Sequence, residues 1–397
     1  LKKINLNNGF NDPTMLREKL FFDFSRDHDV LTPRAVFGNV SFNGSLLGFY
    51  GVVEQVDNEF LDRWVDETSG NMFKAGDNFG TGGTAAADLA WYGSSQSSYS
   101  ARYELKTNTT LNDWSDLLDL IDVINNSTDA QLETALPTMM DWQPLLRSLA
   151  IDNLFANLDS YINSARNYYI YHNDSLGYWQ WIKWDANEAF GRYSGGVQNL
   201  LNLSPDYVAS TRPLMTRIIN IPSFRAAYHV EFCHVLDAFT NALLDQHIDS
   251  LVTLIQPSVF AAPNQQYTNA QFTTNITSNI TGGGGGGGGG QAIYGLKSFI
   301  SSRRSYLTGV LDCSTVGIAE ENVDVIGVWP SPTTGDVQVK LPAGSSLATL
   351  RVLDITGRVV PVPRSGSVLS LAALRSGMYT VVAERNGALI RQRVVKE

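Results

Sequence analysis

Hydrophobic and polar positions divide the chain into a mixed first part and a strand-rich end. The segment "AVFGNVSFNGSLLGFYGVVEQV" alternates and predicts two strands joined at Asn43-Gly44, a dipeptide typical of tight hairpins. In "WSDLLDLIDVIN" and "DWQPLLRSLAIDNLFANLDSYI" the apolar residues recur at helical spacing, which predicts two helices between residues 111 and 165. Residues 212–255 and 291–312 are predicted to be helical again.

Two short aromatic runs follow the second predicted helix. "NYYIYHN" and "YWQWIKW" are joined by "DSLG" and predict a hairpin. Both faces of the second run are largely aromatic, which is typical of a strand that is buried on both sides. Asp185 comes where this strand ends, so we expect a cation, a metal or several N–H donors beside it. A capping role before a helical turn at Asn187 to Phe190 is the simpler alternative.

From about residue 320 the pattern changes to short alternating strands that are separated by Gly and Pro turns. This pattern predicts a small β-sandwich of about seven strands. We therefore expect an α+β protein with a first domain at 1–312, a linker at 313–321 and a sandwich at 322–397. The nine glycines from Gly282 to Gly290 predict a flexible tether, or they stand in place of a loop whose sequence is undetermined. The Gly- and Ser-rich stretch from Gly80 to Ser100 predicts a surface loop.

Composition excludes some classes of function. The net charge of −10 and the pI of about 5.0 argue against nucleic acid as the main partner. No run of about 18 apolar residues occurs, so no transmembrane segment is expected. Cys233 and Cys313 fit no metal-ligand spacing and form either one disulfide or two buried thiols. Because the chain starts at Leu1 without Met, we expect a processed or excised piece.

Two acids carry the candidate chemistry. Asp159 lies near the end of the second predicted helix, and Asp185 follows one hairpin later. In phosphoryl transfer one carboxylate takes the proton of the acceptor hydroxyl while another holds the metal. Protein kinases place a catalytic acid first, then an Asn, a hairpin and a metal-binding acid with a Phe-Gly turn. The same order occurs here, with Asp159, then Asn163 or Asn167, the hairpin, Asp185 and Phe190-Gly191. Spacing alone also allows both acids to be caps or turn formers.

The segment "NLDSYINSARNYYIYHNDSLGYWQWIKWDANEAFG" resembles the CotH kinase family, the spore-coat-type atypical protein kinases. "LNNGFNDPTMLREKL", "MFKAG", "YELKTN" and "YGLKSFISSRRSYL" resemble that family in the same order, so the resemblance covers residues 1–312. It implies a divergent protein-kinase-like fold that uses ATP and Mg²⁺ or Mn²⁺. The implied activity is transfer of the ATP γ-phosphate to Ser or Thr hydroxyls of secreted or surface proteins.

The resemblance also implies roles for five residues. Asp159 is expected to be the catalytic acid and Asp185 the metal-binding acid. Their carboxylates should then lie within about 10 Å, because metal–oxygen distances are about 2.0–2.6 Å. Asn187 stands at a second metal position where the family has Asp, so it should hold the metal more weakly. Asn167 and Glu54 are expected to belong to the cofactor site: Asn167 stands near the metal or organises the loop, and Glu54 helps to position the nucleotide.

The family's phosphate-binding lysine belongs to a segment that we expect upstream of Leu1. Lys74 and Lys106 are expected to be structural, and residues 1–397 alone to transfer phosphate poorly. We also expect exposed apolar surface on the side where the upstream strands would pack. A pseudokinase or adhesion module and a carbohydrate-binding module remain alternatives. The second rests on Trp179, Trp181 and Trp184, which are otherwise interpreted as core.

The end of the chain has its own resemblance. "WPSPTTGDVQVKLP", "LRVLDITGRVV" and "LRSGMYTVVAERNG" resemble the C-terminal sorting domain of type IX secretion. This resemblance implies the secretion machinery as a partner and a secreted or outer-surface location. Its Gly and Pro are turn residues of a small sandwich, so the domain is expected to act as an address and not as a catalyst.

Overall fold

The structure is a computed structural model, and it describes residues 3–76, 85–281, 292–314, 326–341, 345, 347–354, 358–385 and 388–397. It separates into two compact units, Leu1–Cys313 and Ser314–Glu397, which are treated one by one below. The glycine run and most of the predicted linker lie outside the described residues.

The first unit begins with a three-stranded antiparallel sheet in the order β1-β3-β2. Its strands are β1 (Ile4–Asn7), β2 (Ala35–Phe42) and β3 (Ser45–Glu54). Asn43 and Gly44 both have positive φ (50° and 84°), the left-handed geometry that a tight hairpin turn requires, so the predicted hairpin is confirmed. Apolar side chains are exposed along β1, with Ile4 at 48% and Leu6 at 45%.

A second antiparallel sheet has the order β5-β4-β6-β7. It contains β4 (Met72–Ala75), β5 (Tyr103–Leu105), β6 (Tyr168–Asn173) and β7 (Tyr178–Lys183). The aromatic hairpin is confirmed, because β6 and β7 pair from Tyr168↔Lys183 to Asn173↔Tyr178. Trp179 and Trp181 are buried, at 2% and 4% exposure, and the Trp181 ring stacks on Tyr168 at 4.2 Å between centroids. The strand is therefore buried on both faces, as its pattern predicted.

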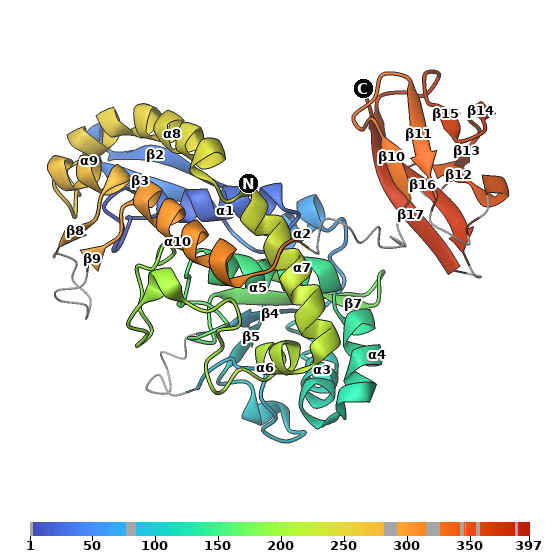
Figure 1. Ribbon diagram of the computed structural model, residues 1–397, viewed down its shortest axis with the longest axis horizontal. Helices are drawn as coiled ribbons and strands as arrows, with labels where there is room; N and C mark the ends of the chain where they lie inside the picture. Colours follow the sequence, from blue (N-terminus) through green and yellow to red (C-terminus); the bar gives the residue numbers. More distant parts are fainter. Residues whose placement is uncertain are drawn as a thin grey trace. The chain divides into compact units, whose positions relative to one another are not determined.

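Helices surround the two sheets (Figure 1). Figure 1 shows α8, α9 and α10 beside the sheet of β2 and β3, and α3, α4 and α6 near the sheet of β4 to β7. The helices are α1 (Arg17–Asp27), α2 (Asn58–Trp64), α3 (Ser115–Asn126), α4 (Asp129–Met139), α5 (Trp142–Leu154), α6 (Pro213–Asn220), α7 (Pro222–Ala238), α8 (Asn241–Ala261), α9 (Asn269–Thr277) and α10 (Leu296–Val310). Short elements are η1 (Gln96–Ser98), η2 (Leu200–Asn202), β8 (Ile280–Thr281) and β9 (Ala292–Ile293).

The second predicted helix was too long. It was expected to include Asp159, but α5 ends at Leu154. Ala156 has a φ of 44°, and the Asn157 backbone N–H turns back to the Asp152 carbonyl at 2.8 Å. The Asn157 side chain also donates to the Asp152 carboxylate at 3.1 Å. These bonds end the helix early, so Asp159 lies on a loop.

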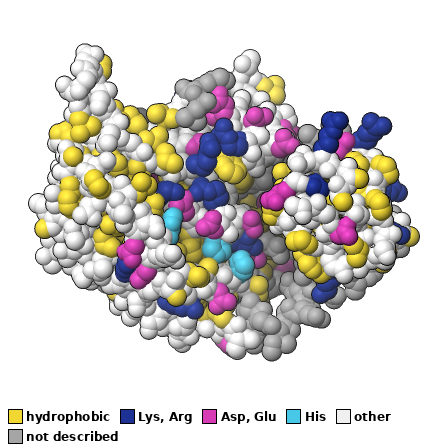
Figure 2. All heavy atoms as spheres, turned by 90° about the horizontal axis from the view of Figure 1, so that it is seen from above, with side chains coloured by type: hydrophobic (Ala, Val, Ile, Leu, Met, Phe, Trp, Pro, Cys, Tyr) yellow, Lys and Arg dark blue, Asp and Glu magenta, His cyan; other side chains and the backbone are white. Residues whose placement is uncertain are grey.

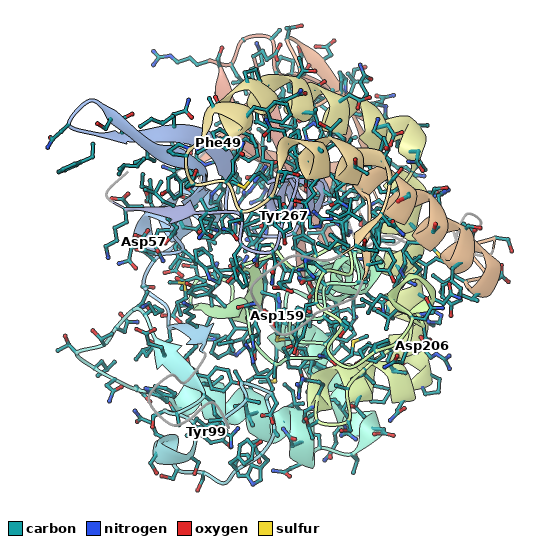
Figure 3. The ribbon with its side chains drawn as sticks, turned by 90° about the vertical axis from the view of Figure 1, so that its left-hand side faces the viewer. Phe49, Asp57, Tyr99, Asp159, Asp206 and Tyr267 are labelled. Carbon is teal, nitrogen blue, oxygen red and sulfur yellow. A yellow bond between two sulfur atoms is a disulfide. The ribbon has the colours of Figure 1, made fainter. Side chains whose placement is uncertain are left out.

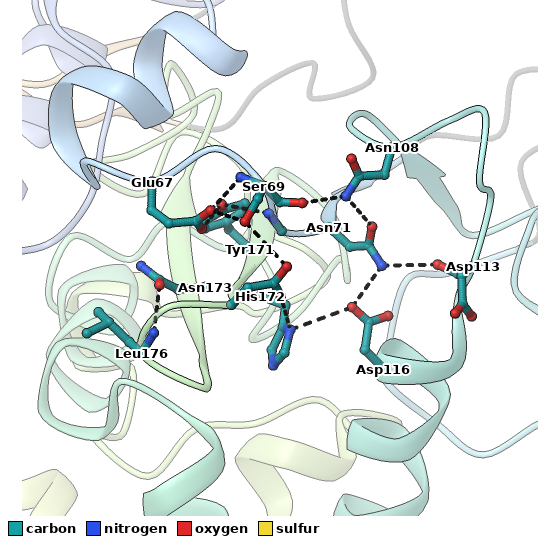
Figure 4. A network of polar contacts seen from close by, with 12 residues as sticks. Glu67, Ser69, Asn71, Asn108, Asp113, Asp116, Tyr171, His172, Asn173 and Leu176 are labelled. Atoms are coloured by element: carbon teal, nitrogen blue, oxygen red, sulfur yellow. Dashed lines mark hydrogen bonds and ion pairs between the residues drawn. The ribbon is translucent and has the colours of Figure 1, made fainter.

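A polar network ties β6 to the segments before α3 (Figure 4). Glu67 accepts hydrogen bonds from the Tyr171 hydroxyl and from Ser69. Asn71 donates to the Asp116 carboxylate at 3.0 Å and accepts from Asn108 at 3.0 Å. The network therefore fixes the turn end of the aromatic hairpin, which is opposite to the end that Asp185 follows.

The two cysteines form a disulfide between Cys233 on α7 and Cys313 after α10. The thiol alternative is therefore wrong. The bond closes a loop with a sequence separation of 80 residues, and crosslinks of long loops stabilise chiefly by restricting the unfolded chain.

Replacing both cysteines by alanine is expected to lower the free energy of unfolding by about 3–4 kcal/mol. Urea denaturation of the oxidised protein and of the Cys233→Ala/Cys313→Ala variant measures the difference. Reduced wild type is the control and should unfold like the variant. Identical midpoints for oxidised wild type and variant would contradict a stabilising role of the bond.

The second unit consists of two four-stranded sheets, β10-β11-β15-β14 and β13-β12-β16-β17. Its strands are β10 (Gly327–Trp329), β11 (Asp336–Lys340), β12 (Arg351–Leu353), β13 (Val359–Val360), β14 (Arg364–Ser365), β15 (Val368–Ser370), β16 (Gly377–Arg385) and β17 (Ala388–Lys396), with η3 at Leu347–Thr349. Val337 and Leu369 of one sheet share a buried core with Val352, Val381 and Val394 of the other. The predicted sandwich is confirmed, with eight strands among the described residues instead of about seven.

Candidate functional site

The loop after α5 presents Asp159 near the middle of the first unit (Figure 3). The side chain is 19% exposed. The amide of Asn167 donates to the Asp159 carbonyl oxygen at 2.7 Å and to its Oδ2 at 3.0 Å. Arg166 Nε lies 3.6 Å from the other carboxylate oxygen, Oδ1. Asp159 is thus a partly exposed carboxylate whose orientation is fixed from both sides.

The structure also separates the two asparagines that the sequence left as alternatives. Asn167 is the one that contacts Asp159. Asn163 accepts a hydrogen bond from the Tyr207 hydroxyl, and its carbonyl accepts one from Arg212. Gly195 packs directly on it, because a Cβ there would lie 2.2 Å from Asn163 Nδ2. Asn163 therefore supports the neighbouring loop, and Asn167 orients the candidate catalytic acid.

Strand β7 presents Asp185 at its end. Asp185 has a φ of 49°, which lies in the left-handed region of backbone conformation. This conformation is costly for a non-glycine residue, and residues that adopt it cluster at functional sites. Phe190 has a φ of 60° and is buried against Phe155 at 5.0 Å and Phe299 at 5.4 Å between ring centroids. The turn from Asp185 to Gly191 is therefore anchored at both ends, by the buried strand and by the Phe190 ring.

A buried ion pair connects the helix that precedes Asp159 with the strand that precedes Asp185. Lys183, the last residue of β7, contacts the carboxylate of Asp152 on α5, and both side chains are at most 3% exposed. Burial lowers the pKa of Lys183 and raises that of Asp152, while their mutual attraction opposes both shifts. Because Asp152 also receives the Asn157 amide, this pair positions the loop of Asp159 relative to the end of β7.

The segment Asn8–Asp12, called the N-terminal loop below, lies against the Asp185 turn. The Asn187 amide donates to the Phe10 carbonyl at 3.0 Å, and the Asn11 amide donates to Glu188 at 2.9 Å. Arg192 donates to the Asn11 carbonyl at 2.7 Å. These bonds join residues that are more than 170 positions apart in the sequence.

A pocket of about 480 Å³ opens between these elements, within the size range of small-molecule sites. β1, β3, the N-terminal loop, α1 and the turn after β7 form its wall, which includes Tyr50, Glu18, Asp185 and Asn187. A separate cavity of about 30 Å³ near Tyr267 has room only for water. Asp185 and Asn187 thus face a space of suitable size for a ligand.

The pocket is acidic. Burial, and after it the charge of Asp185, raise the pKa of Glu18 to about 8, although the side chain of Asn7 and the Ala186 N–H partly oppose the shift. Burial and the charge of Asp159 raise the pKa of Glu188, while the Asn11 side chain lowers it. The sequence did not single out Glu18, because an acid in the first turn of an amphipathic helix is an ordinary feature.

Asp159 does not line this pocket. The charge of Asp159 raises the pKa of Glu188, which belongs to the turn that follows Asp185. The approach of the Asp159 and Asp185 carboxylates to within about 10 Å stays a prediction.

Glu54 has a different environment from the one we expected. Its carboxylate is buried and bonded to Arg34, Arg63 and the Trp64 indole. Burial favours a higher pKa, but the hydrogen bonds from Arg34 and Trp64 outweigh it, so the pKa of Glu54 is lowered. Glu54 does not line the pocket, and this geometry gives no support to a role in positioning nucleotide.

The remaining candidates are structural. Lys74 Nζ lies 5.8 Å from the Trp184 ring centroid and 5.9 Å from that of Tyr169, which fits cation–π packing. The burial of Trp179 and Trp181 confirms that these two belong to the core and removes them as a sugar-stacking surface. Histidine side chains gather among acidic and basic groups on one face (Figure 2). The partners of three of them are ordinary: His28 bonds to the Phe24 carbonyl, His229 to Asp206 and His247 to Asp23.

Comparison with known proteins agrees with this division of the chain. The family model described as CotH kinase protein matches residues 1–307, and the one described as secretion system C-terminal sorting domain matches residues 327–397. The protein "Inner spore coat protein H" of Bacillus subtilis (strain 168) is 30% identical over 268 residues, which cover 66% of this chain and 70% of that protein. Among the described residues, no helix has the length and apolar character needed to cross a membrane.

Proposed function

This chain belongs to the CotH kinase protein family and ends in a secretion-system sorting domain, and from that premise we propose that it is a secreted or surface protein kinase. It transfers the γ-phosphate of ATP to Ser or Thr hydroxyls of extracytoplasmic proteins. The observation that carries the proposal is the pocket of about 480 Å³ after the end of β7, with Asp185 and Asn187 on its wall. The sorting domain supports export through a secretion system.

The donor atoms around the pocket fit a hard divalent cation. Asp185 offers a carboxylate, and Asn187 keeps its Oδ1 for a ligand because its amide nitrogen is bonded to the Phe10 carbonyl. Oxygen ligands of this kind, completed by phosphate oxygens, are typical of Mg²⁺ and Mn²⁺ sites. Such an ion neutralises the phosphate charge of ATP in a pocket that would otherwise repel it.

Asp159 is the residue that we assign to the acceptor hydroxyl. Its partial exposure lets a substrate reach it, and the two hydrogen bonds from Asn167 hold the carboxylate in one orientation. The carboxylate accepts the hydroxyl proton as the oxygen attacks phosphorus. Arg166 Nε lies 3.6 Å from the other carboxylate oxygen and so helps to hold the carboxylate in place.

Metal-dependent binding of ATP tests the proposal. Wild type should gain thermal stability from ATP only when Mg²⁺ or Mn²⁺ is present, by about 2.7 kcal/mol at a ligand concentration 100 times the Kd. Asp185→Asn should lose this gain, because the metal loses its charged ligand. Asp29→Asn, which removes the same charge from a side chain that is 90% exposed, is the control and should behave like wild type. Equal gains in wild type and Asp185→Asn would count against Asp185 as a ligand.

A second candidate is a pseudokinase that binds nucleotide without transferring phosphate. Asn187 favours it, since the family position that it occupies carries Asp and a neutral oxygen holds the cation less tightly. ATP would then stabilise the protein as described, but no phosphate would reach an acceptor. The transfer assay in the Discussion separates the two candidates.

A further inference from the structure

Strand β2 forms an open edge of the β1-β3-β2 sheet. It pairs with β3 along its whole length, from Ala35↔Val53 to Phe42↔Ser45, and it is the last strand in the sheet order. Within the part of the chain that the structure describes, no main-chain hydrogen bond joins β2 to any element except β3. Such an edge presents a row of N–H and C=O groups, which is a template for pairing with a further strand.

β2 lacks the features that usually protect an edge strand. Protected edges carry charged side chains or proline, are interrupted by a bulge, or are very short. β2 has eight residues, and no residue from Ala35 to Val53 is charged or is a proline. The register irregularity of the hairpin places its extra residue, Leu47, on β3, so the side chains of β2 alternate without interruption. The opposite edge strand, β1, is only four residues long.

Exposed apolar side chains gather at the same edge. Among the described residues of the first unit, the five most exposed large apolar side chains include Leu254 at 71%, Phe42 at 66% and Val36 at 57%. Leu254 belongs to α8, which lies beside β2 (Figure 1) and whose Ser258 accepts a hydrogen bond from the Asn39 amide at 3.2 Å. Because Leu254 lies one helical turn before Ser258, it faces the same side of α8. Apolar side chains that gather on an exposed surface mark an interaction site.

The distribution of charge favours a second copy of the chain as the partner. The net charge of −10 makes two copies repel each other over much of their surface. The hairpin of β2 and β3 has no charged residue, so two copies can meet there without bringing like charges together. A strongly charged partner would gain nothing from this uncharged edge, because charged partners are recognised by complementary charge.

The sequence of β2 is also complementary to itself in an antiparallel arrangement. A two-fold axis at Asn39 places Val36 opposite Phe42 of the second copy, and Val40 opposite Gly38. Val36, Val40 and Phe42 are separated by even numbers of residues and therefore share one face of the strand. The pairing thus forms a continuous apolar stripe across both copies, and the two copies use the same surface, as two-fold interfaces require.

We propose that two copies of this chain associate through β2, with Asn39 at the two-fold axis, so that their two three-stranded sheets become one continuous antiparallel sheet. Main-chain hydrogen bonds between the two β2 strands and the apolar contact of Val36 with Phe42 hold the copies together. The proposal does not depend on the pocket or on the proposed kinase activity.

Sedimentation velocity of the full chain over a range of concentrations tests the proposal, and wild type should show a monomer–dimer equilibrium. Val36→Lys/Phe42→Lys places lysine opposite lysine, and we expect the dimer Kd to rise by about 100-fold or more. Val36→Glu/Phe42→Glu should have the same effect alone. An equimolar mixture of the two variants should dimerise again, because each lysine then faces a glutamate. Leu111→Lys, at a 76% exposed position in the segment before α3, is the control and should dimerise like wild type.

A cysteine crosslink tests the register of the two strands. Both native cysteines are already bonded to each other, so an introduced cysteine is the free thiol. Asn39→Cys should form a disulfide between copies on mild oxidation, because directly opposite residues have Cα atoms about 4.5–5.5 Å apart. Ser41→Cys should not, because its two copies are offset by four residues, or about 13 Å. Wild type that stays monomeric at every concentration, a dimer that the lysine variant leaves intact, or crosslinking of Ser41→Cys in preference to Asn39→Cys would overturn the proposal.

Discussion

Asp159→Asn is expected to bind ATP with Mg²⁺ as wild type does, while its rate of phosphoryl transfer falls by about 10²- to 10⁴-fold. The amide has the shape of the carboxylate but does not accept the hydroxyl proton. The loop should survive the change, because the bond from Asn167 to the main-chain carbonyl of residue 159 does not involve the altered group. A radiolabelled-ATP assay on the full-length protein with casein-like acceptors measures the rate.

Asp174→Asn is the control for this experiment. Asp174 is an acid at the turn between β6 and β7, its side chain is 51% exposed, and its removal should leave transfer unchanged. Undiminished transfer by Asp159→Asn would show that another group takes the proton. If wild type binds ATP with metal and yet transfers no phosphate, the pseudokinase candidate is correct.

Lys183→Met is expected to destabilise the first unit by about 3–5 kcal/mol, the usual cost of removing one partner of a buried ion pair. Methionine fills most of the space of the lysine stem, so the main cost is the Asp152 carboxylate, which stays buried without its cation. Urea denaturation at neutral pH gives the free energy. An exposed lysine pair provides the comparison: Lys106→Met, whose partner Glu104 is 61% exposed, should change stability by less than about 1 kcal/mol.

The pH dependence of the Lys183→Met variant follows from the same burial. Burial already raises the pKa of Asp152 in the folded protein, and loss of the lysine raises it further. A carboxyl whose folded pKa lies above its unfolded value costs stability at high pH, and the cost disappears as the pH falls towards the unfolded value of about 3.9. The difference between wild type and variant should therefore shrink on acidification. A difference that stays constant from neutral pH to about pH 4 would contradict this origin.

The same pair bears on function, because it connects the strand that ends at Asp185 with the helix that precedes Asp159. Lys183 lies two residues before Asp185, and Asp152 also bonds Asn157 at the start of the Asp159 loop. Replacing the pair by apolar residues of similar volume commonly restores stability. We expect that such a protein would recover its fold while the loop of Asp159 loses one of its anchors.

The sequence alone determined the elements whose signals are local. The Asn43-Gly44 hairpin, the aromatic hairpin and the alternation of the C-terminal sandwich all depend on residues that are close together in the chain, so periodicity and turn chemistry are sufficient to predict them. The position of Asp185 at a strand end follows from the same local pattern. The family resemblance added an expected order of roles but no geometry.

Only the tertiary structure decided the polar partners. The early end of α5, the choice of Asn167 over Asn163 and the ion cluster of Glu54 depend on side-chain bonds that no propensity encodes. The pocket wall brings Glu18 and the N-terminal loop to a turn that lies more than 160 residues further along the chain. The physical reason is that the cost of burying a charge is set by everything that packs around it. A sequence shows which residues carry charge, but the fold decides which charges are buried together and therefore which of them need a ligand.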